Sequence, residues 1–361
     1  MSEFPGLDAL GYTPRWEALF APHAAQGLAP ARVIRCDRGT ALIATPAGIV
    51  RARPSARLLK SAAGPADLPA VGDWVAVLAP PDLDVPLVEA VLARATAITR
   101  GDPGRTSDLQ VLAANIDTVL VVHPIADPPN LRRIERELSL AWGSGAVPVV
   151  VLTKADLCAD PGAARAAVEA VAPGVIVHVV NALDGGGTGA LLAHVAERRT
   201  SVLIGPSGAG KSTLINALLG ERRQATREVR VSDGRGRHTT VARELILVPG
   251  GGVLIDSPGL RALGLTGSED GISIAFPDIE DVALACRFHD CTHGGEPGCA
   301  VRAAVESGTL PAERLVSYGK LRREARIAAT KTDAKLRAEE ERRWKIIRKA
   351  ARAFQRRSGR R

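Results

Sequence analysis

The sequence has few cysteines and few aromatic residues, and it lacks long apolar runs. Its 361 residues include only 5 cysteines, 1 methionine and 3% aromatic residues. No run approaches the roughly 18 uninterrupted apolar residues that a membrane-spanning helix needs. The first residues, MSEFPGLDAL, are acidic where a secretory signal needs a basic start and an apolar block. A disulfide-stapled miniprotein is therefore excluded, and we expect a cytoplasmic protein of two or three domains.

Positive charge is plentiful, but it is concentrated at one end. The formal net charge is +8, and residues 320–361 hold 17 Lys and Arg against 5 Asp and Glu. The rest of the chain is therefore slightly acidic. A cationic end on such a body indicates a protein that meets a polyanion, because counterion release drives such binding. A solubilising tail is the alternative.

The first hundred residues are punctuated by turn residues. Residues 1–27 carry several prolines and glycines with weak periodicity, which predicts a flexible N-terminal arm with at most one short helix. Residues 28–100 contain five short apolar runs between turns: ARVIRC, ALIATP, GIVRARP, GDWVAVLA and LVEAVLA. This pattern predicts a small five-stranded β-barrel.

Residues 101–270 change to apolar runs that alternate with helical stretches. The runs are DTVLVV, VPVVVLT, VIVHVV, SVLIG and GVLID. Continuous Val, Ile and Leu runs followed by polar turns indicate an α/β domain with a parallel sheet covered on both faces. Ligands bind such sheets at the carboxyl ends of the strands, so we expect the functional residues to gather along one edge.

The segment GPSGAGKS, residues 205–212, follows one of these runs and precedes the helical pattern TLINALLG. It fits the phosphate-binding loop Gly-x4-Gly-Lys-Ser, in which backbone N–H groups surround the phosphates, Lys211 reaches the β and γ oxygens and Ser212 binds Mg²⁺. A glycine-rich turn is the alternative. The predicted phosphate-binding residues are Gly205, Pro206, Ser207, Gly208, Ala209, Gly210, Lys211, Ser212 and Thr213.

A second motif, DSPG, follows the run GVLI. The carboxylate of Asp256 can hold a water of Mg²⁺, and the N–H of Gly259 can sense the γ-phosphate. ATP-binding cassette proteins also open with GPSGAGKS, but the LSGGQ segment that they require is absent. These two motifs predict a nucleotide switch.

The segment TKAD, residues 153–156, is a candidate reader of guanine. Asp156 can accept the ring N–H and the exocyclic amine of guanine, while Lys154 lays its alkyl stem over the base. A simple helix cap at Asp156 is the alternative. After the next strand come Asn181 and Ala182, whose backbone amides could meet the guanine oxygen.

The order of these motifs predicts a circular permutation. Ordinary GTPases place the phosphate loop first and the base-reading Asp last, whereas here Asp156 precedes Lys211 by 55 residues. The order TKAD, NAL, GPSGAGKS, GRHTT and DSPG, preceded by GDWV and followed by Cys-x4-Cys-x-His-x5-Cys, resembles the bacterial small-ribosomal-subunit-dependent GTPase A family, the YjeQ/RsgA type. The resemblance covers roughly residues 28–320.

This resemblance implies an oligonucleotide-binding (OB) barrel, a permuted P-loop GTPase and a zinc domain. The function that it implies is late maturation of the small (30S) ribosomal subunit, with GTP hydrolysis stimulated by that subunit. Thr153 departs from the family's usual Asn, which removes a side-chain amide but keeps a hydroxyl donor.

Leu260 stands where Ras-like enzymes carry a glutamine that orients the attacking water, so another group must do so. His238 is the nearest polar candidate and resembles the family's proposed catalytic residue; a solvated loop residue or an RNA contact is the alternative. Thr239 and Thr240 follow it in the switch. We assign the magnesium ligands to Ser212, Thr240 and Asp256.

Residues 271–325 contain three cysteines and a histidine within fourteen positions. Three thiolates and one imidazole are the ligand set of a closed structural zinc site, with free reduced thiols as the alternative. His293 rather than His289 fits the family's spacing. The predicted ligands are Cys286, Cys291, His293 and Cys299.

Residues 326–361 have the composition of a basic helix that folds against RNA. The whole chain is therefore expected to be a monomeric GTPase that binds GTP with Mg²⁺, one Zn²⁺ and the rRNA of the small ribosomal subunit. A nucleotide-regulated RNA-binding module with incidental turnover is one alternative. A P-loop ATPase or small-molecule kinase is another.

Overall fold

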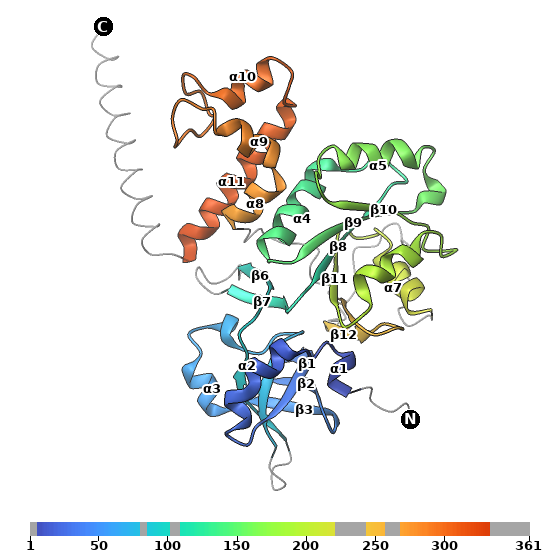
Figure 1. Ribbon diagram of the computed structural model, residues 1–361, viewed down its shortest axis with the longest axis vertical. Coiled ribbons are helices and arrows are strands. Elements are labelled where there is room, and N and C mark those ends of the chain that lie inside the picture. The colour runs from blue at the N-terminus through green and yellow to red at the C-terminus, as the bar shows by residue number, and fades with distance from the viewer. Residues whose placement is uncertain (1–5, 80–84, 102–108, 221–242, 257–267, 333–361) are drawn as a thin grey trace, which may run out of the picture.

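The computed structural model describes residues 6–79, 85–101, 109–220, 243–256 and 268–332. The β-barrel, the α/β domain that carries the predicted nucleotide motifs and the C-terminal helices follow one another along the long axis of the molecule (Figure 1). The α/β domain is called the nucleotide domain below. Within the described residues, no helix is long and apolar enough to cross a membrane.

The five predicted barrel strands are all present, and they close on themselves. They are β1 (Ala29–Asp37), β2 (Thr40–Thr45), β3 (Gly48–Pro54), β4 (Trp74–Leu78) and β5 (Leu87–Val91). Neighbours pair in the order β1-β2-β3-β5-β4, β4 returns to β1, and only β3 with β5 is parallel. Small apolar side chains fill the interior, among them Ala31, Val33, Ile43, Val75 and Val88. The prediction of a five-stranded barrel is confirmed.

The N-terminal segment differs from the flexible arm that its prolines and glycines predict. It forms two helices, α1 (Gly6–Ala9) and α2 (Pro14–Ala24), because Pro14 is compatible with the first turn of a helix. Trp16 and Phe20 of α2 are buried, and Tyr12 meets the barrel residue Trp74 edge to face at 5.0 Å. Burying an aromatic side chain of this size contributes about 2 kcal/mol, which outweighs the weak local pattern.

The nucleotide domain is built on a parallel sheet of the five predicted strands. They are β8 (Thr118–Pro124), β9 (Val147–Thr153), β10 (Ile176–Val179), β11 (Thr200–Ile204) and β13 (Val253–Asp256), in the order β10-β9-β8-β11-β13. Successive residues of β8 enter different apolar cores, Val119 and Val121 on one face and Leu120 and Val122 on the other. Both faces are therefore covered, as the continuous apolar runs predict.

Several short elements complete this region, and the sequence pattern did not reveal the antiparallel ones. β12 (Glu244–Leu247) runs antiparallel to β13 and meets the barrel strand β1, where Glu244 faces Arg35. β6 (Ala97–Gly101) and β7 (Leu109–Ala114) form a separate antiparallel pair. The helices and 3₁₀ turns of this region are α4 (Leu131–Gly143), η2 (Ala155–Leu157), α5 (Pro161–Glu169), η3 (Thr188–Leu191), α6 (Leu192–Val195) and α7 (Lys211–Leu219). The barrel has its own short helical elements between β3 and β4, α3 (Ala56–Ser61) and η1 (Pro65–Asp67).

The C-terminal unit is helical and packs against α4. Its helices are α8 (Glu269–Ala275), α9 (Pro277–Ala283), α10 (Ala300–Glu306) and α11 (Ala312–Thr332). Gly271 of α8 allows this packing, since a Cβ there would lie 2.4 Å from the Ser139 carbonyl oxygen of α4. Ile272 and Phe276 belong to the same apolar core as Ile134 of α4. This unit therefore shares an apolar core with the nucleotide domain.

Candidate nucleotide site and metal cluster

The segment 205–212 forms the loop between β11 and the first turn of α7, as predicted. Gly205, Gly208 and Gly210 adopt positive φ angles, and a Cβ at Gly205 would lie 2.1 Å from the Val122 carbonyl oxygen of β8. Only glycine fits that approach. The N-terminus of α7, which begins at Lys211, adjoins this loop, and a helix N-terminus beside a glycine-rich loop is an arrangement that binds phosphate.

The ammonium group of Lys211 is held over this loop. It donates hydrogen bonds to the carbonyl oxygens of Gly205 at 2.8 Å and Pro206 at 2.6 Å. Ser212 and Thr213 follow in the first turn of α7, both half-buried. Asp256 ends β13, the strand beside β11, so it lies at the same carboxyl edge of the sheet.

The segment 153–156, predicted to read guanine and called the base-reading segment below, leaves β9, two strands from β11, at the same edge. Lys154 has φ +59°, a left-handed conformation that turns the chain sharply, and Asp156 follows in η2 with an exposed side chain. The N–H of Ala155 donates to the carbonyl oxygen of Val180, just past β10. This contact brings the segments around Asp156 and Asn181 together.

Asn181 uses its side chain within its own turn. Its Oδ1 accepts the N–H of Leu183 at 3.2 Å, and its Nδ2 donates to Asp184 at 2.8 Å. Asn181 and Ala182 are half-buried. The polar side-chain atoms of Asn181 are thus both used within the turn.

Thr153 is buried, with 1% of its surface exposed. Its hydroxyl donates to the carbonyl oxygen of Ala209 in the phosphate loop at 2.6 Å, and also lies 3.3 Å from the carbonyl oxygen of His123. The residue at the family's Asn position therefore ties the base-reading segment to the phosphate loop.

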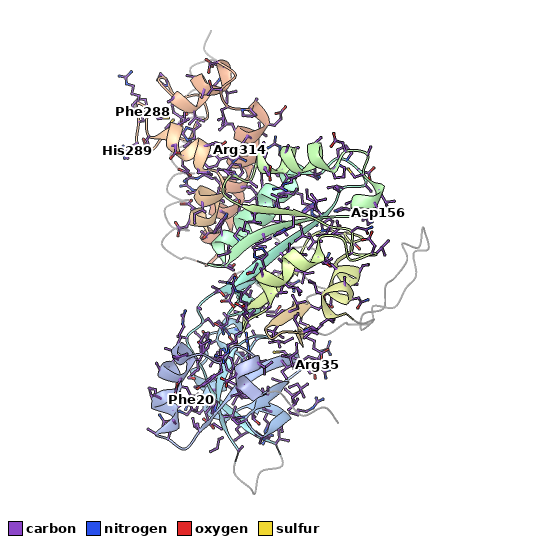
Figure 2. The ribbon with its side chains drawn as sticks, turned by 45° about the vertical axis from the view of Figure 1, so that its right-hand side comes forward. Phe20, Arg35, Asp156, Phe288, His289 and Arg314 are labelled. Atoms are coloured by element: carbon purple, nitrogen blue, oxygen red, sulfur yellow. The ribbon has the colours of Figure 1, made fainter. Side chains whose placement is uncertain are left out.

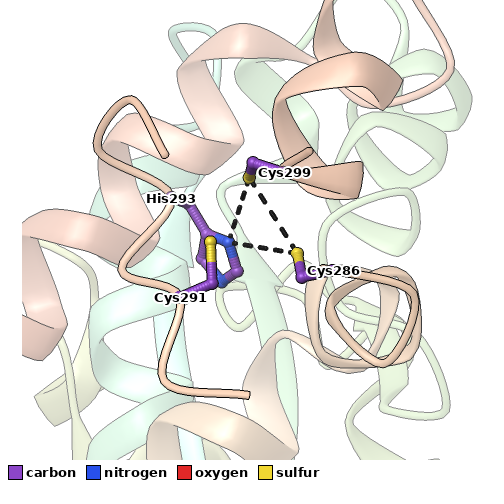
Figure 3. A group of neighbouring side chains, drawn as sticks. All are labelled: Cys286, Cys291, His293 and Cys299. Carbon is purple, nitrogen blue, oxygen red and sulfur yellow. Dashed lines mark hydrogen bonds between the residues drawn. The ribbon is translucent and has the colours of Figure 1, made fainter. Parts of the chain in front are cut away.

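The three cysteines and one histidine of the C-terminal unit converge, as Figure 3 shows. All four candidate ligand atoms lie within 4.8 Å of one another. Cys286 Sγ lies 4.0 Å from Cys299 Sγ, and His293 Nδ1 lies 3.4 Å from Cys299 Sγ and 3.8 Å from Cys286 Sγ. Ligands around one tetrahedral Zn²⁺ lie about 3.8 Å apart for two sulfurs and about 3.6 Å apart for sulfur and nitrogen. The cluster has the size of a zinc site.

The surroundings shift the pKa values of these groups in different directions. Desolvation opposes ionisation of the Cys286 thiol, but hydrogen bonds from the backbone and from the neighbouring cysteines outweigh it and lower the pKa of Cys286. Desolvation, together with the neighbouring sulfurs, raises the pKa of Cys291 to about 11, so this thiol does not ionise by itself at neutral pH. Burial lowers the pKa of His293, which keeps its imidazole neutral and able to donate a lone pair. A dication would stabilise all three thiolates at once.

Comparison with known proteins identifies the family of the chain. A sequence model of the RsgA GTPase family matches residues 91–266. A curated relative from Streptomyces coelicolor, named small ribosomal subunit biogenesis GTPase RsgA, is 48% identical over 341 residues, which are 94% of this chain and 92% of its own. A relative of the same name from Opitutus terrae is 44% identical and is matched over 98% of this chain and 99% of its own.

The chain belongs to the RsgA GTPase family. Two solved structures share its fold. YjeQ from Thermotoga maritima aligns with a TM-score of 0.63 and 24% identity over 82% of this chain and 98% of its own. YloQ, described as a circularly permuted GTPase, aligns with a TM-score of 0.59 and 23% identity, covering 82% and 95%. The predicted family, barrel and permuted order are therefore confirmed.

Some predicted RsgA-type residues lie outside the described residues: His238, Thr239, Thr240 and Gly259. The other predicted residues of the nucleotide site lie at the carboxyl edge of the sheet and in the loops that leave it. Sequence reasoning missed His123, a buried histidine directly below these loops. The signal was present, since His123 directly follows the run DTVLVV, in the position where sites form on parallel sheets.

Proposed function

We propose that this chain is a GTPase of small ribosomal subunit biogenesis, which binds GTP with Mg²⁺ and hydrolyses it to GDP and phosphate. The observation that carries this proposal is the joining of a phosphate loop to a base-reading segment through Thr153 and Ala209, at 2.6 Å, in a member of the RsgA GTPase family. Because this hydrogen bond fixes the two loops relative to each other, one can bind the phosphates and the other the base of a single nucleotide.

Each part of the site has a distinct role. N–H groups of the phosphate loop and of α7 bind the phosphates, and Lys211 neutralises the β and γ oxygens. Asp156 accepts the two N–H groups of guanine, which adenine cannot present in the same places. Ser212 and Asp256 would hold Mg²⁺ directly and through water, with Thr240 as the third ligand. The ion supplies charge stabilisation where negative charge develops between the β- and γ-phosphates.

We assign orientation of the attacking water to His238. Leu260 cannot hydrogen-bond water, whereas His238 adjoins the switch threonines and follows Gly234 and Gly236. These four residues lie outside the described part of the chain.

Replacement His238→Ala should lower subunit-stimulated turnover by at least about 10²-fold, because proton handling by one positioned side chain contributes 10²- to 10⁴-fold. GTP affinity should stay nearly unchanged. Single-turnover assays with small ribosomal subunits measure this, with Leu260→Ala as the variant expected to have a much smaller effect. Subunit-stimulated turnover of His238→Ala within about threefold of wild type would show that His238 does not orient the attacking water.

The Cys and His cluster is proposed to hold one structural Zn²⁺. Cys286, Cys291, His293 and Cys299 would hold the ion as a closed set of four protein ligands, so the ion would stabilise the fold of this unit rather than activate water.

Purified protein should contain about one zinc per chain. Replacement Cys291→Ser should remove the zinc and loosen α9 and α10, because a serine hydroxyl is a weaker zinc ligand than a thiolate and lowers the affinity of the cluster for zinc. Metal analysis by mass spectrometry measures the zinc, and hydrogen exchange measures the loosening. Cys158→Ser, which changes a half-buried cysteine outside the cluster, should keep the metal. Zinc-free wild-type protein would contradict the assignment.

The partner proposed for the chain is the small ribosomal subunit. Its curated relatives carry that subunit in their name, and the basic end of the chain suits an rRNA surface. The proposed state in solution is a monomer in the cytoplasm, and hydrolysis would serve as a checkpoint or release step.

The decisive experiment measures GTP hydrolysis with and without purified small subunits, with ATP and large subunits as controls. We expect slow turnover alone and strong stimulation by the small subunit only. Turnover that is insensitive to subunits would favour a nucleotide-regulated RNA-binding module, and hydrolysis of ATP would favour a P-loop ATPase.

A further inference from the structure

Helix α4 lies between the C-terminal unit and the nucleotide site, and it carries buried acidic side chains toward both. Glu135 is fully buried and Glu137 is 8% exposed. A carboxylate with so little access to water must be paired to be tolerated. Each pairs with an arginine of α4 itself, Glu135 with Arg132 and Glu137 with Arg133, and each has a second partner in another part of the fold.

Glu135 faces the C-terminal unit. Its Oε1 accepts a hydrogen bond at 3.0 Å from Arg314 of α11, which is 3% exposed and is labelled in Figure 2. Arg314 also donates to Asp278 of α9 at 2.7 Å and to the Ala275 carbonyl oxygen of α8, and it stacks on Phe276 at 4.6 Å. One guanidinium therefore fixes three helices of the C-terminal unit to α4.

A second ion pair joins the same two helices nearer to solvent. Arg136 of α4 lies 2.7 Å from Glu324 of α11, and both side chains are about one-third exposed. Together the two contacts set the position of α11 along α4.

Glu137 faces the nucleotide site. Its Oε2 accepts a hydrogen bond from Nε2 of His123 at 2.7 Å, and its Oε1 accepts one from Arg133 at 2.9 Å. His123 is 2% exposed and lies near the carboxyl end of β8. Its imidazole therefore attaches the end of this strand to α4 in a region that water does not reach.

The attached stretch of β8 supports both ligand-binding loops. The carbonyl oxygen of Val122 lies against Gly205, where the phosphate loop begins. The carbonyl oxygen of His123 lies 3.3 Å from the Thr153 hydroxyl that binds Ala209, and the N–H of Ile125 donates to the Thr153 carbonyl oxygen at 2.9 Å. A shift at His123 would therefore move the phosphate loop and the base-reading segment together.

We infer that α4 couples the position of the C-terminal unit to the position of the two ligand-binding loops. His123 is the positioning residue that joins α4 to the strand beneath these loops. The inference rests on the proposed function, because the position of the C-terminal unit acquires a consequence only if the unit docks on the small subunit. His123 touches no substrate in this scheme. It acts through the backbone of β8. The two contacts of α4, through Glu135 to α11 and through Glu137 to β8, are both buried and belong to one helix.

The nucleotide end is tested with a matched pair of variants. His123→Leu keeps the volume and loses the hydrogen bond, whereas His123→Gln can place an amide donor where Nε2 lies. We expect His123→Leu to lower subunit-stimulated kcat about tenfold, with co-sedimentation on small subunits unchanged, and His123→Gln to recover most of this loss. A merely structural histidine would lower the melting temperature of both variants and leave the ratio of stimulated to intrinsic turnover as in wild type.

The C-terminal end is tested in a double-mutant cycle. Arg314→Met should also lower stimulated kcat about tenfold, and the double variant with His123→Leu should lose about tenfold rather than a hundredfold, because both changes interrupt one connection. If Arg314→Met does not fold, Glu324→Gln replaces it with a smaller expected loss of about threefold. Arg165→Gln, which breaks an exposed ion pair with Glu169 on α5, is the control and should match wild type.

Fold-losses that multiply in the double variant would overturn the inference, as would an unchanged stimulation ratio in His123→Leu. Either result leaves the proposed function intact, because wild-type protein still hydrolyses GTP faster on the subunit. Absence of stimulation in wild-type protein would instead remove the proposed function itself.

Discussion

Replacement Lys211→Ala is expected to abolish measurable GTP hydrolysis, with and without small ribosomal subunits. Its ammonium lies over the phosphate loop, 2.8 Å from the carbonyl oxygen of Gly205 and 2.6 Å from that of Pro206. In the proposed function this ammonium neutralises the β- and γ-phosphates of GTP. Negative charge moves between these phosphates as the bond to the γ-phosphorus breaks, so losing the cation removes stabilisation of the transition state as well as binding.

Phosphate release assays measure the turnover, and fluorescent GTP analogues measure the binding. Lys60→Ala, which removes an exposed lysine from α3 on the barrel, is the matched control and should keep intrinsic turnover. Circular dichroism should show that the Lys211 variant is folded, because its side chain is half-buried and lies outside the apolar cores. Full stimulated turnover in folded Lys211→Ala would refute the phosphate loop.

Replacement Asp156→Asn is expected to transfer the preference of the site from GTP to xanthosine triphosphate. The carboxylate is exposed in η2, directly after the strand that carries Thr153. It can accept from the ring N–H and the exocyclic amine of guanine. An amide there offers a donor to the exocyclic oxygen of xanthine and leaves the guanine amine unpaired. Sites that read such groups by hydrogen bonds reject the wrong partner by about 10⁴-fold.

Competition binding with both nucleotides measures the exchange of preference. Asp160→Asn is the matched control, because Asp160 caps α5 by accepting the N–H of Ala163 at 2.9 Å and asparagine caps helices equally well. We expect this control to prefer GTP as wild type does. An unchanged preference for GTP in the Asp156 variant would mean that this carboxylate too is only a structural group.

The sequence alone was sufficient for local features. Gly205, Gly208 and Gly210 all adopt positive φ, and Gly205 also lies against β8, so the phosphate loop could be recognised from the spacing of its glycines. Val-rich runs predict the parallel strands because buried strands need apolar side chains on both faces. Thiol and imidazole spacing predicted the metal cluster, since ligands so near in the chain can meet around one ion.

The sequence could not show how distant segments pack. The N-terminal residues looked like an arm because prolines and glycines hide the helical pattern, yet Trp16 and Phe20 find a buried surface that only the folded barrel provides. The short strand β12 is recognisable only once β13 and β1 lie on either side of it. In both cases tertiary burial outweighs local propensity.

The same limit applies to the site. Thr153 reads as a weakened guanine contact in the sequence, whereas its hydroxyl joins the base-reading segment to Ala209, 56 positions along the chain. His123, Glu137 and Arg314 have no motif. Their roles come from ion pairs and hydrogen bonds between α4, β8 and α11, and partners so far apart in sequence become neighbours only when the helices pack. Residue type and spacing specify which chemistry is possible at each loop, and burial of long-range contacts specifies which loops share one site.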